Sequence, residues 1–129
     1  MSWFVNAISM ISILLSGCAF DFADVRYSPA TLQSLTQPER TFALIGDVHM
    51  SQAPCGFSRT LRQKTRWEFV GAISQGGVFR SRDQTLTVEC SNVFEAYLVV
   101  SGDHLVGFFL PVEDGFVAIA DPIQLPIEH

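Results

Sequence analysis

Apolar and polar residues alternate along most of the chain after residue 40, in short runs with turn residues between them. An alternation with a period of two is typical of a β-strand that buries one face and exposes the other. In the stretch 61–74, Trp67, Phe69 and Ile73 fall on one side of an extended chain. Arg66, Glu68 and Val70 fall on the opposite side. Further runs with strand character lie at 41–50, 78–82, 85–90, 94–101, 104–110 and 116–120. The pattern therefore predicts about six or seven strands.

Short turn sequences join the predicted strands. They are Gln75-Gly76-Gly77, Gly102-Asp103 and Glu113-Asp114-Gly115. Links this short favour antiparallel pairing of consecutive strands, so the expected fold class is all-β, a small antiparallel sandwich or barrel. Glycines inside the strands, such as Gly46, Gly71 and Gly107, predict bulges or sharp curvature.

Residues 18–40 lack this strand pattern. Charged residues are scattered along the stretch, and two prolines interrupt it. Ser28 and Pro29 suit the N-cap and the first position of a helix, which predicts at most two helical turns over Ala30–Leu35. We therefore expect a loose tether at 18–40 that leads into one β domain at 41–129.

The first 17 residues have the character of a secretory leader. Residues 3–15 are mostly apolar and carry no charge. The run is shorter than the roughly 20 residues that span a bilayer, whereas the apolar part of a signal peptide needs about 7–15. It ends in Leu15-Ser16-Gly17-Cys18, which resembles the lipobox of bacterial lipoproteins. Residues 1–6 depart from the usual leader because they contain no Lys or Arg.

The lipobox resemblance implies that residues 1–17 form a signal peptide and that Cys18 is the first residue of the mature chain. In that class a diacylglycerol is attached to the cysteine sulfur and a further acyl chain to its amino group. Several acyl chains hold a soluble domain at a bilayer without a spanning helix. Ala19, where an Asp would signal inner-membrane retention in enteric bacteria, implies an outer-membrane anchor facing the periplasm. The alternative is an amphipathic or buried N-terminal segment of a cytosolic protein.

Two further cysteines, Cys55 and Cys90, lie in the predicted β domain. An even pair in an oxidising periplasm predicts one disulfide. The alternative is a metal site completed by a histidine. No Cys-x-x-Cys or His-x-x-x-His spacing supports that site, so we expect a disulfide, no metal and no cofactor.

The charge of the chain is unevenly distributed. The net charge of −5, with 8 Lys and Arg residues, excludes a strongly basic nucleic-acid-binding protein. Basic residues concentrate in 59–82, whereas 83–129 contains no Lys or Arg. The first part of the basic block consists of Arg59, Arg62, Lys64 and Arg66. On one hairpin, with Arg62, Lys64 and Arg66 on one face of one strand, these side chains would form a patch for an anionic partner, such as lipid headgroups, lipopolysaccharide or an acidic protein surface. The alternative is a solvated face that pairs with acidic neighbours across the sheet.

Few residues suggest catalysis. Asp47 and His49 are two residues apart and fall on the same side of an extended chain, where a carboxylate orients an imidazole for general-base chemistry. No nucleophile or third ligand accompanies them, and no nucleotide-binding fingerprint occurs in the chain. An enzyme is therefore not the expected class.

The expected function is a non-catalytic, membrane-anchored binding or assembly module of the bacterial envelope, whose partner is an envelope protein or the cell wall. A second hypothesis is a protective lipoprotein, because the size and the anchor are similar to those of periplasmic lysozyme inhibitors and of immunity or exclusion lipoproteins. The stretch 74–79 departs from the Ser-Gly-x-x-Tyr inhibitory loop of that inhibitor class. A third hypothesis is a small cell-wall or lipid hydrolase that uses Asp47 and His49.

Overall fold

The computed structural model describes residues 26–51, 55 and 59–128, so Cys18 and the predicted signal peptide lie outside the described residues. Regular structure in the described part is β, apart from one 3-10 turn at Pro38–Arg40. The strands are β1 (Ser28–Pro29), β2 (Gln33–Ser34), β3 (Phe42–Leu44), β4 (Val48–Met50), β5 (Arg59–Leu61), β6 (Arg66–Ile73), β7 (Gly76–Ser81), β8 (Thr87–Glu89), β9 (Val93–Glu95), β10 (Tyr97–Ser101), β11 (His104–Leu110), β12 (Gly115–Gln124) and β13 (Ile127–Glu128). The predicted all-β, antiparallel fold class is confirmed.

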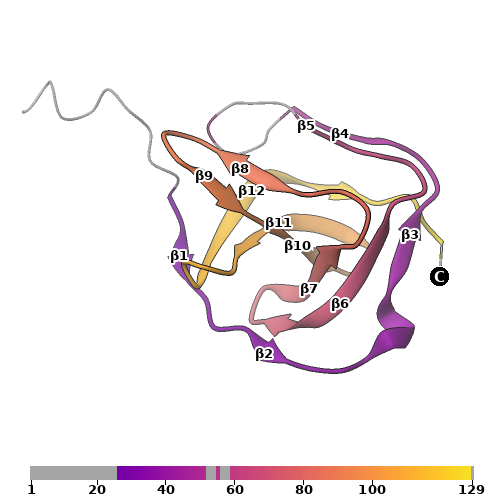
Figure 1. Ribbon diagram of the computed structural model, residues 1–129, viewed down its shortest axis with the longest axis horizontal. Helices are drawn as coiled ribbons and strands as arrows, with labels where there is room; N and C mark the ends of the chain where they lie inside the picture. The colour runs from indigo at the N-terminus through magenta and orange to yellow at the C-terminus, as the bar shows by residue number, and fades with distance from the viewer. Residues whose placement is uncertain (1–25, 52–54, 56–58, 129) are drawn as a thin grey trace, which may run out of the picture.

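Nine of these strands form one large antiparallel sheet. Its order is β1-β12-β11-β10-β7-β6-β3-β13, and β2 pairs with β6. β13 follows β12 closely in the chain but pairs with β3 at the opposite end of the sheet. The sheet therefore curls around its core, as Figure 1 shows, without being a closed barrel. The C-terminal segment thus belongs to this sheet through β13.

Two short ribbons complete the fold. β4 pairs with β5, and β8 pairs with β9. Both ribbons appear on the same side of the molecule, at the top of Figure 1. Their apolar side chains, such as Met50, Leu61 and Val88, belong to the same core cluster as those of the large sheet. The ribbons therefore cover part of the space that the curled sheet encloses.

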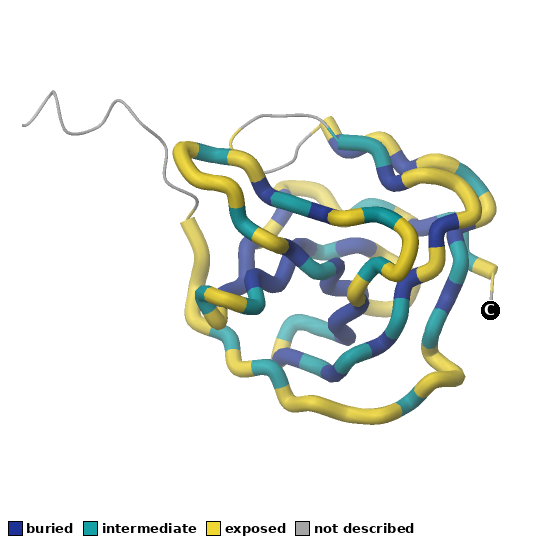
Figure 2. Tube along the Cα trace, viewed as in Figure 1, coloured by how far each residue is buried: buried dark blue, intermediate teal, exposed yellow. Residues whose placement is uncertain are grey.

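The main core lies on the concave face of the sheet, where the tube in Figure 2 is mostly buried. Its largest side chains with almost no exposed surface are Trp67, Phe108, Leu44, Leu61, Leu98, Leu105 and Leu110. Burial of aromatic and branched side chains on this scale is the principal stabilising contribution to a domain of this size. Ala96, Leu98 and Val100 all belong to this core, which is the alternation expected of the strand run at 94–101.

A second, smaller apolar cluster lies on the other face of the sheet. It consists of Ile73, Val78, Val99, Phe109 and Phe116. Ala30 and Leu32, from the segment before the first long strand, pack against it. The segment is held at its two ends, since β1 pairs with β12 and β2 pairs with β6. Without this segment the outer apolar cluster would face water.

The expected helix over Ala30–Leu35 is therefore wrong. The chain there is extended, and its backbone groups pair with sheet strands instead of with each other. The later part of the expected tether also packs on the domain, because the guanidinium carbon of Arg40 lies 4.1 Å from the centre of the Phe69 ring. Residues 28–40 consequently belong to the β domain.

Two predicted bulges are confirmed, at Gly71 in β6 and at Gly107 in β11. The strand register shifts between Phe69 and Gly71 in the β6–β7 pair, and between Leu105 and Gly107, which pair with the adjacent residues Val100 and Val99 of β10. A bulge inserts one residue and reverses the faces of the residues beyond it. Ile73 accordingly packs in the outer cluster, not on the Trp67 face as the simple alternation predicted.

We expect Gly107→Ala to lower the free energy of unfolding by about 2–3 kcal/mol. A Cβ atom at this position would collide with the Val117 carbonyl oxygen and the Phe116 ring on the neighbouring strand. The matched control is Gly46→Ala, whose added methyl group would meet only Pro126, at an ordinary 3.7 Å. Urea unfolding followed by circular dichroism measures both. Equal stability of the two variants would contradict the close strand approach at Gly107.

Candidate binding site

The predicted cysteine pair links the two ribbons. Cys55 and Cys90 are joined as a disulfide, with their Cα atoms 5.5 Å apart. A second link lies beside it, where Nη2 of Arg59 donates to the carbonyl oxygen of Thr87 at 3.3 Å and lies 3.4 Å from Oε2 of Glu89. The β4–β5 and β8–β9 ribbons are thus fastened to each other by a covalent and an ionic contact.

The predicted anionic-partner patch does not lie on one strand face. β5 ends at Leu61, and Lys64 has a positive φ of 71° in the turn before β6. Arg59 pairs with Glu89, and Arg66 pairs with Asp83 at 3.5 Å. Arg62 and Lys64 are exposed and have no ion-pair partner among the described residues. The expected common strand face of Arg62, Lys64 and Arg66 is therefore wrong, because Arg62 and Lys64 lie in the turn between β5 and β6 and only Arg66 belongs to a strand.

Asp47 and His49 border the same open hollow, but each is engaged with a different group. Asp47 Oδ1 accepts a hydrogen bond of 2.7 Å from the backbone N–H of Gln63. Nδ1 of His49 lies 3.0 Å from Oγ1 of Thr60 on the paired strand. Asp47 thereby stabilises the turn that follows β5, and the two side chains are not hydrogen-bonded to each other.

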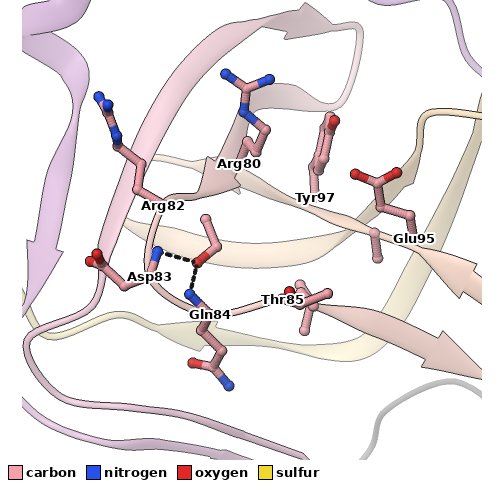
Figure 3. A pocket seen from close by; sticks show the side chains of 10 residues that line it. Arg80, Arg82, Asp83, Gln84, Thr85, Glu95 and Tyr97 are labelled. Atoms are coloured by element: carbon pink, nitrogen blue, oxygen red, sulfur yellow. Dashed lines mark hydrogen bonds between the residues drawn. The ribbon is translucent and has the colours of Figure 1, made fainter.

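A pocket of about 260 Å³ opens beside the outer apolar cluster. Its walls come from the end of β7, the link to β8, and the junction of β9 with β10. The lining residues are Arg80, Ser81, Arg82, Asp83, Gln84, Thr85, Leu86, Glu95, Ala96 and Tyr97. In Figure 3, Arg80, Tyr97 and Glu95 stand side by side, and their polar ends point in the same direction. The pocket thus presents cationic, phenolic and anionic groups next to one another.

Strand register explains why Arg80 and Tyr97 are neighbours. Leu98 pairs with Phe79 in the β10–β7 ladder, so the preceding residue of β10 faces the following residue of β7. Arg80 also lies opposite Glu68 of β6. These three side chains occupy successive strands and share the outer face of the sheet.

The two pocket arginines share one carboxylate. Nη2 of Arg80 and Nη1 of Arg82 each lie 3.5 Å from Oε2 of Glu68. Each guanidinium carries five N–H donors, and one nitrogen of each makes this contact. Both side chains are about half exposed, so most of their donors face solvent. The pair therefore retains one positive charge that Glu68 does not compensate.

The other carboxylates around the pocket differ in their partners. Oδ2 of Asp83 accepts from the backbone N–H of Arg66 at 2.7 Å and pairs with the Arg66 guanidinium. Glu95 has no ion-pair partner among the residues that the structure describes. The pocket consequently has a surplus cation on its Arg80–Arg82 side and an uncompensated anion at Glu95.

A side-chain turn fixes the link that forms one wall of the pocket. The hydroxyl oxygen of Ser81 accepts from the backbone N–H groups of Asp83, at 3.2 Å, and Gln84, at 2.6 Å, as drawn in Figure 3. The Gln84 side chain donates in turn to the carbonyl oxygen of Thr60 on β5. These contacts hold the link in one conformation, which keeps the pocket walls in place.

The contacts of Asp83 predict its titration. The backbone N–H of Arg66, followed by its guanidinium, lowers the pKa of the Asp83 carboxyl below its ordinary value. A carboxyl whose pKa is lower in the folded state contributes stability above its unfolded pKa, and this is lost as the pH falls through the folded pKa. We expect NMR titration to place the Asp83 midpoint below the ordinary value of an aspartate carboxyl. Arg66→Gln is expected to raise the Asp83 midpoint. An unchanged midpoint in Arg66→Gln would show that the backbone N–H of residue 66 alone lowers the pKa of Asp83.

The sequence did not predict this pocket. Arg80 and Arg82 belong to the basic block, but Glu95 and Tyr97 were not singled out. A usable signal was present, because Arg80 lies two positions from Val78 on β7 and Tyr97 lies two positions from Val99 on β10, so each polar residue shares the outer face with an apolar one. Their juxtaposition depends on the register between two strands, which the alternation leaves undetermined.

The described residues contain no group of three or more His, Cys, Asp or Glu side chains placed to hold a metal ion. No helix among them is long and apolar enough to cross a membrane. No family model, curated protein or solved structure matches the chain.

Proposed function

We propose that the protein is a lipoprotein of the bacterial cell envelope, anchored through lipid on Cys18. Its β domain binds another envelope component without catalysing a reaction, and the anchor lies in the outer membrane and faces the periplasm. The observation that carries the proposal is the lipobox-like Leu15-Ser16-Gly17-Cys18, which ends an uncharged apolar run just ahead of a β domain.

Two features of the domain support this role. A cysteine pair at disulfide distance suits an oxidising compartment. The link from Cys18 to Arg26 is short, since eight residues (26 minus 18) span at most about 29 Å when fully extended. A lipidated Cys18 would therefore keep the domain close to the bilayer surface, where envelope components are its neighbours.

The pocket bordered by Arg80, Arg82, Glu95 and Tyr97 is the surface that we assign to binding. Half-exposed guanidinium groups with open donors are suited to carboxylate or phosphate recognition. An aromatic ring beside them adds apolar contact area with little conformational freedom to lose. These groups recognise a ligand, whereas Asp47 and His49 are occupied by other partners.

Intact mass of the protein extracted from membranes tests the anchor. We expect a chain that begins at Cys18 and carries the added mass of diacylglycerol and one further acyl group. An inhibitor of lipoprotein signal peptidase should cause the unprocessed, longer form to accumulate, and Cys18→Ala should abolish lipid attachment. A mature chain of residues 18–129 without added lipid mass would overturn the proposed anchor.

Crosslinking in intact cells tests the binding role. We expect one defined envelope partner to be recovered with the wild type and lost with Arg80→Gln/Arg82→Gln. Arg62→Gln is the matched control, because Arg62 is exposed and does not line the pocket. Equal recovery of the partner from all three proteins would remove the pocket from the binding site.

A further inference from the structure

We propose that the Arg80–Tyr97 pocket binds a small zwitterion that carries a carboxylate and an ammonium group, of the class of amino acids and short peptides. The inference rests on the proposed function, for which it names the ligand class of the binding domain. The carboxylate lies against Arg80 and Arg82, the ammonium against Glu95, and the ligand crosses the ring of Tyr97.

The charges around the pocket complement those of a zwitterion. Arg80 and Arg82 share the single carboxylate of Glu68, and Asp83 is engaged by Arg66. One positive charge therefore remains on that side, while Glu95 lacks an ion-pair partner among the described residues. A ligand with one anionic and one cationic group neutralises both, whereas a simple anion leaves the Glu95 carboxylate in place to oppose it.

The side chains of the pocket place an aromatic ring between opposite charges. Tyr97 stands between Arg80 and Glu95 in Figure 3, so the two charged groups flank an aromatic ring. The ring also packs against the outer apolar cluster, with its centroid 6.4 Å from that of Phe109, which restricts its motion. A ligand whose opposite charges are separated by a short backbone fits across this ring.

Size limits the ligand to a small molecule or to the end of a larger one. The pocket volume of about 260 Å³ equals that of roughly eight or nine water molecules in the liquid. An amino acid or dipeptide fits this space, with Thr85 at the wall to bond a backbone group. A long chain would have to leave the pocket at its open side.

Binding of L-alanyl-L-alanine to the full lipoprotein in detergent tests the inference, with saturation-transfer NMR as the readout. N-acetyl-alanyl-alanine removes the ammonium charge, and alanyl-alanine amide removes the carboxylate. We expect saturable binding of the free dipeptide and about tenfold weaker binding of each blocked form. Acetate is included as a simple anion and is expected to bind more weakly than the dipeptide.

Protein variants show which side chain recognises each end. Glu95→Gln should erase the difference between the free and the acetylated dipeptide, and Arg80→Gln should erase the difference between the free dipeptide and its amide. Arg62→Gln should leave all affinities unchanged. Equal binding of all three peptides, or no saturable binding at tens of millimolar, would overturn the inference. Lipid attachment is measured separately by intact mass, so a failure of zwitterion binding can be told apart from a failure of the proposed lipid anchor.

Discussion

Reduction of the Cys55–Cys90 disulfide is expected to lower the free energy of unfolding by about 4 kcal/mol. The two cysteines are separated by 35 positions, and the crosslink restricts that loop in the unfolded chain. For a domain of about 100 residues, the loss corresponds to a fall in Tm of roughly 15–30 °C. Thermal unfolding of the wild type with and without reductant measures it, and Cys55→Ser/Cys90→Ser removes any effect of the reductant itself.

Hydrogen exchange distinguishes where that stability is lost. The crosslink fastens the β4–β5 ribbon to the β8–β9 ribbon, whereas the β6–β7 pair belongs to the large sheet. We therefore expect reduction to raise exchange first in the two ribbons, while β6 and β7 remain protected. An unchanged Tm after complete reduction would show that the Arg59 contacts and core packing alone hold the ribbons together.

The all-β fold was predictable because its main strands carry strong alternation. The turns at Gly102-Asp103 and 113–115 and the inward faces of β8 and β10 follow directly from local sequence. The Cys55–Cys90 pairing was predictable because only these two cysteines remain once Cys18 is assigned to lipid attachment. These features depend on alternation, turn sequences and cysteine number, none of which requires knowledge of how distant segments pair.

The features that were wrong or missed depend on pairing between distant segments. β1 and β2 are two residues long, too short to show a period, and they pair with β12 and β6 on either side of Ala30 and Leu32, which pack against the outer apolar cluster. Ile73 changes face because Gly71 is bulged. The binding pocket requires the register of β7 against β10, which no local pattern specifies.

Trp67→Ala is expected to lower the free energy of unfolding by about 3–5 kcal/mol. Trp67 is completely buried in the main core, where its ring fills the space inside the curled sheet. Its indole N–H donates to the hydroxyl oxygen of Thr65 at 3.0 Å, and that hydroxyl donates to the carbonyl oxygen of Arg62 at 2.6 Å. The residue therefore joins the core to the turn between β5 and β6.

Two further variants separate packing from hydrogen bonding. Trp67→Phe keeps most of the ring contacts and removes the indole donor, so it should cost less than Trp67→Ala. Thr65→Val leaves a buried N–H and a carbonyl without this partner, at a cost of about 1–3 kcal/mol. Urea unfolding of the two variants and their combination forms a double-mutant cycle, for which we expect a coupling free energy of about 1 kcal/mol. Strict additivity would show that Trp67 stabilises the fold by packing alone and that the hydroxyl chain serves only the turn.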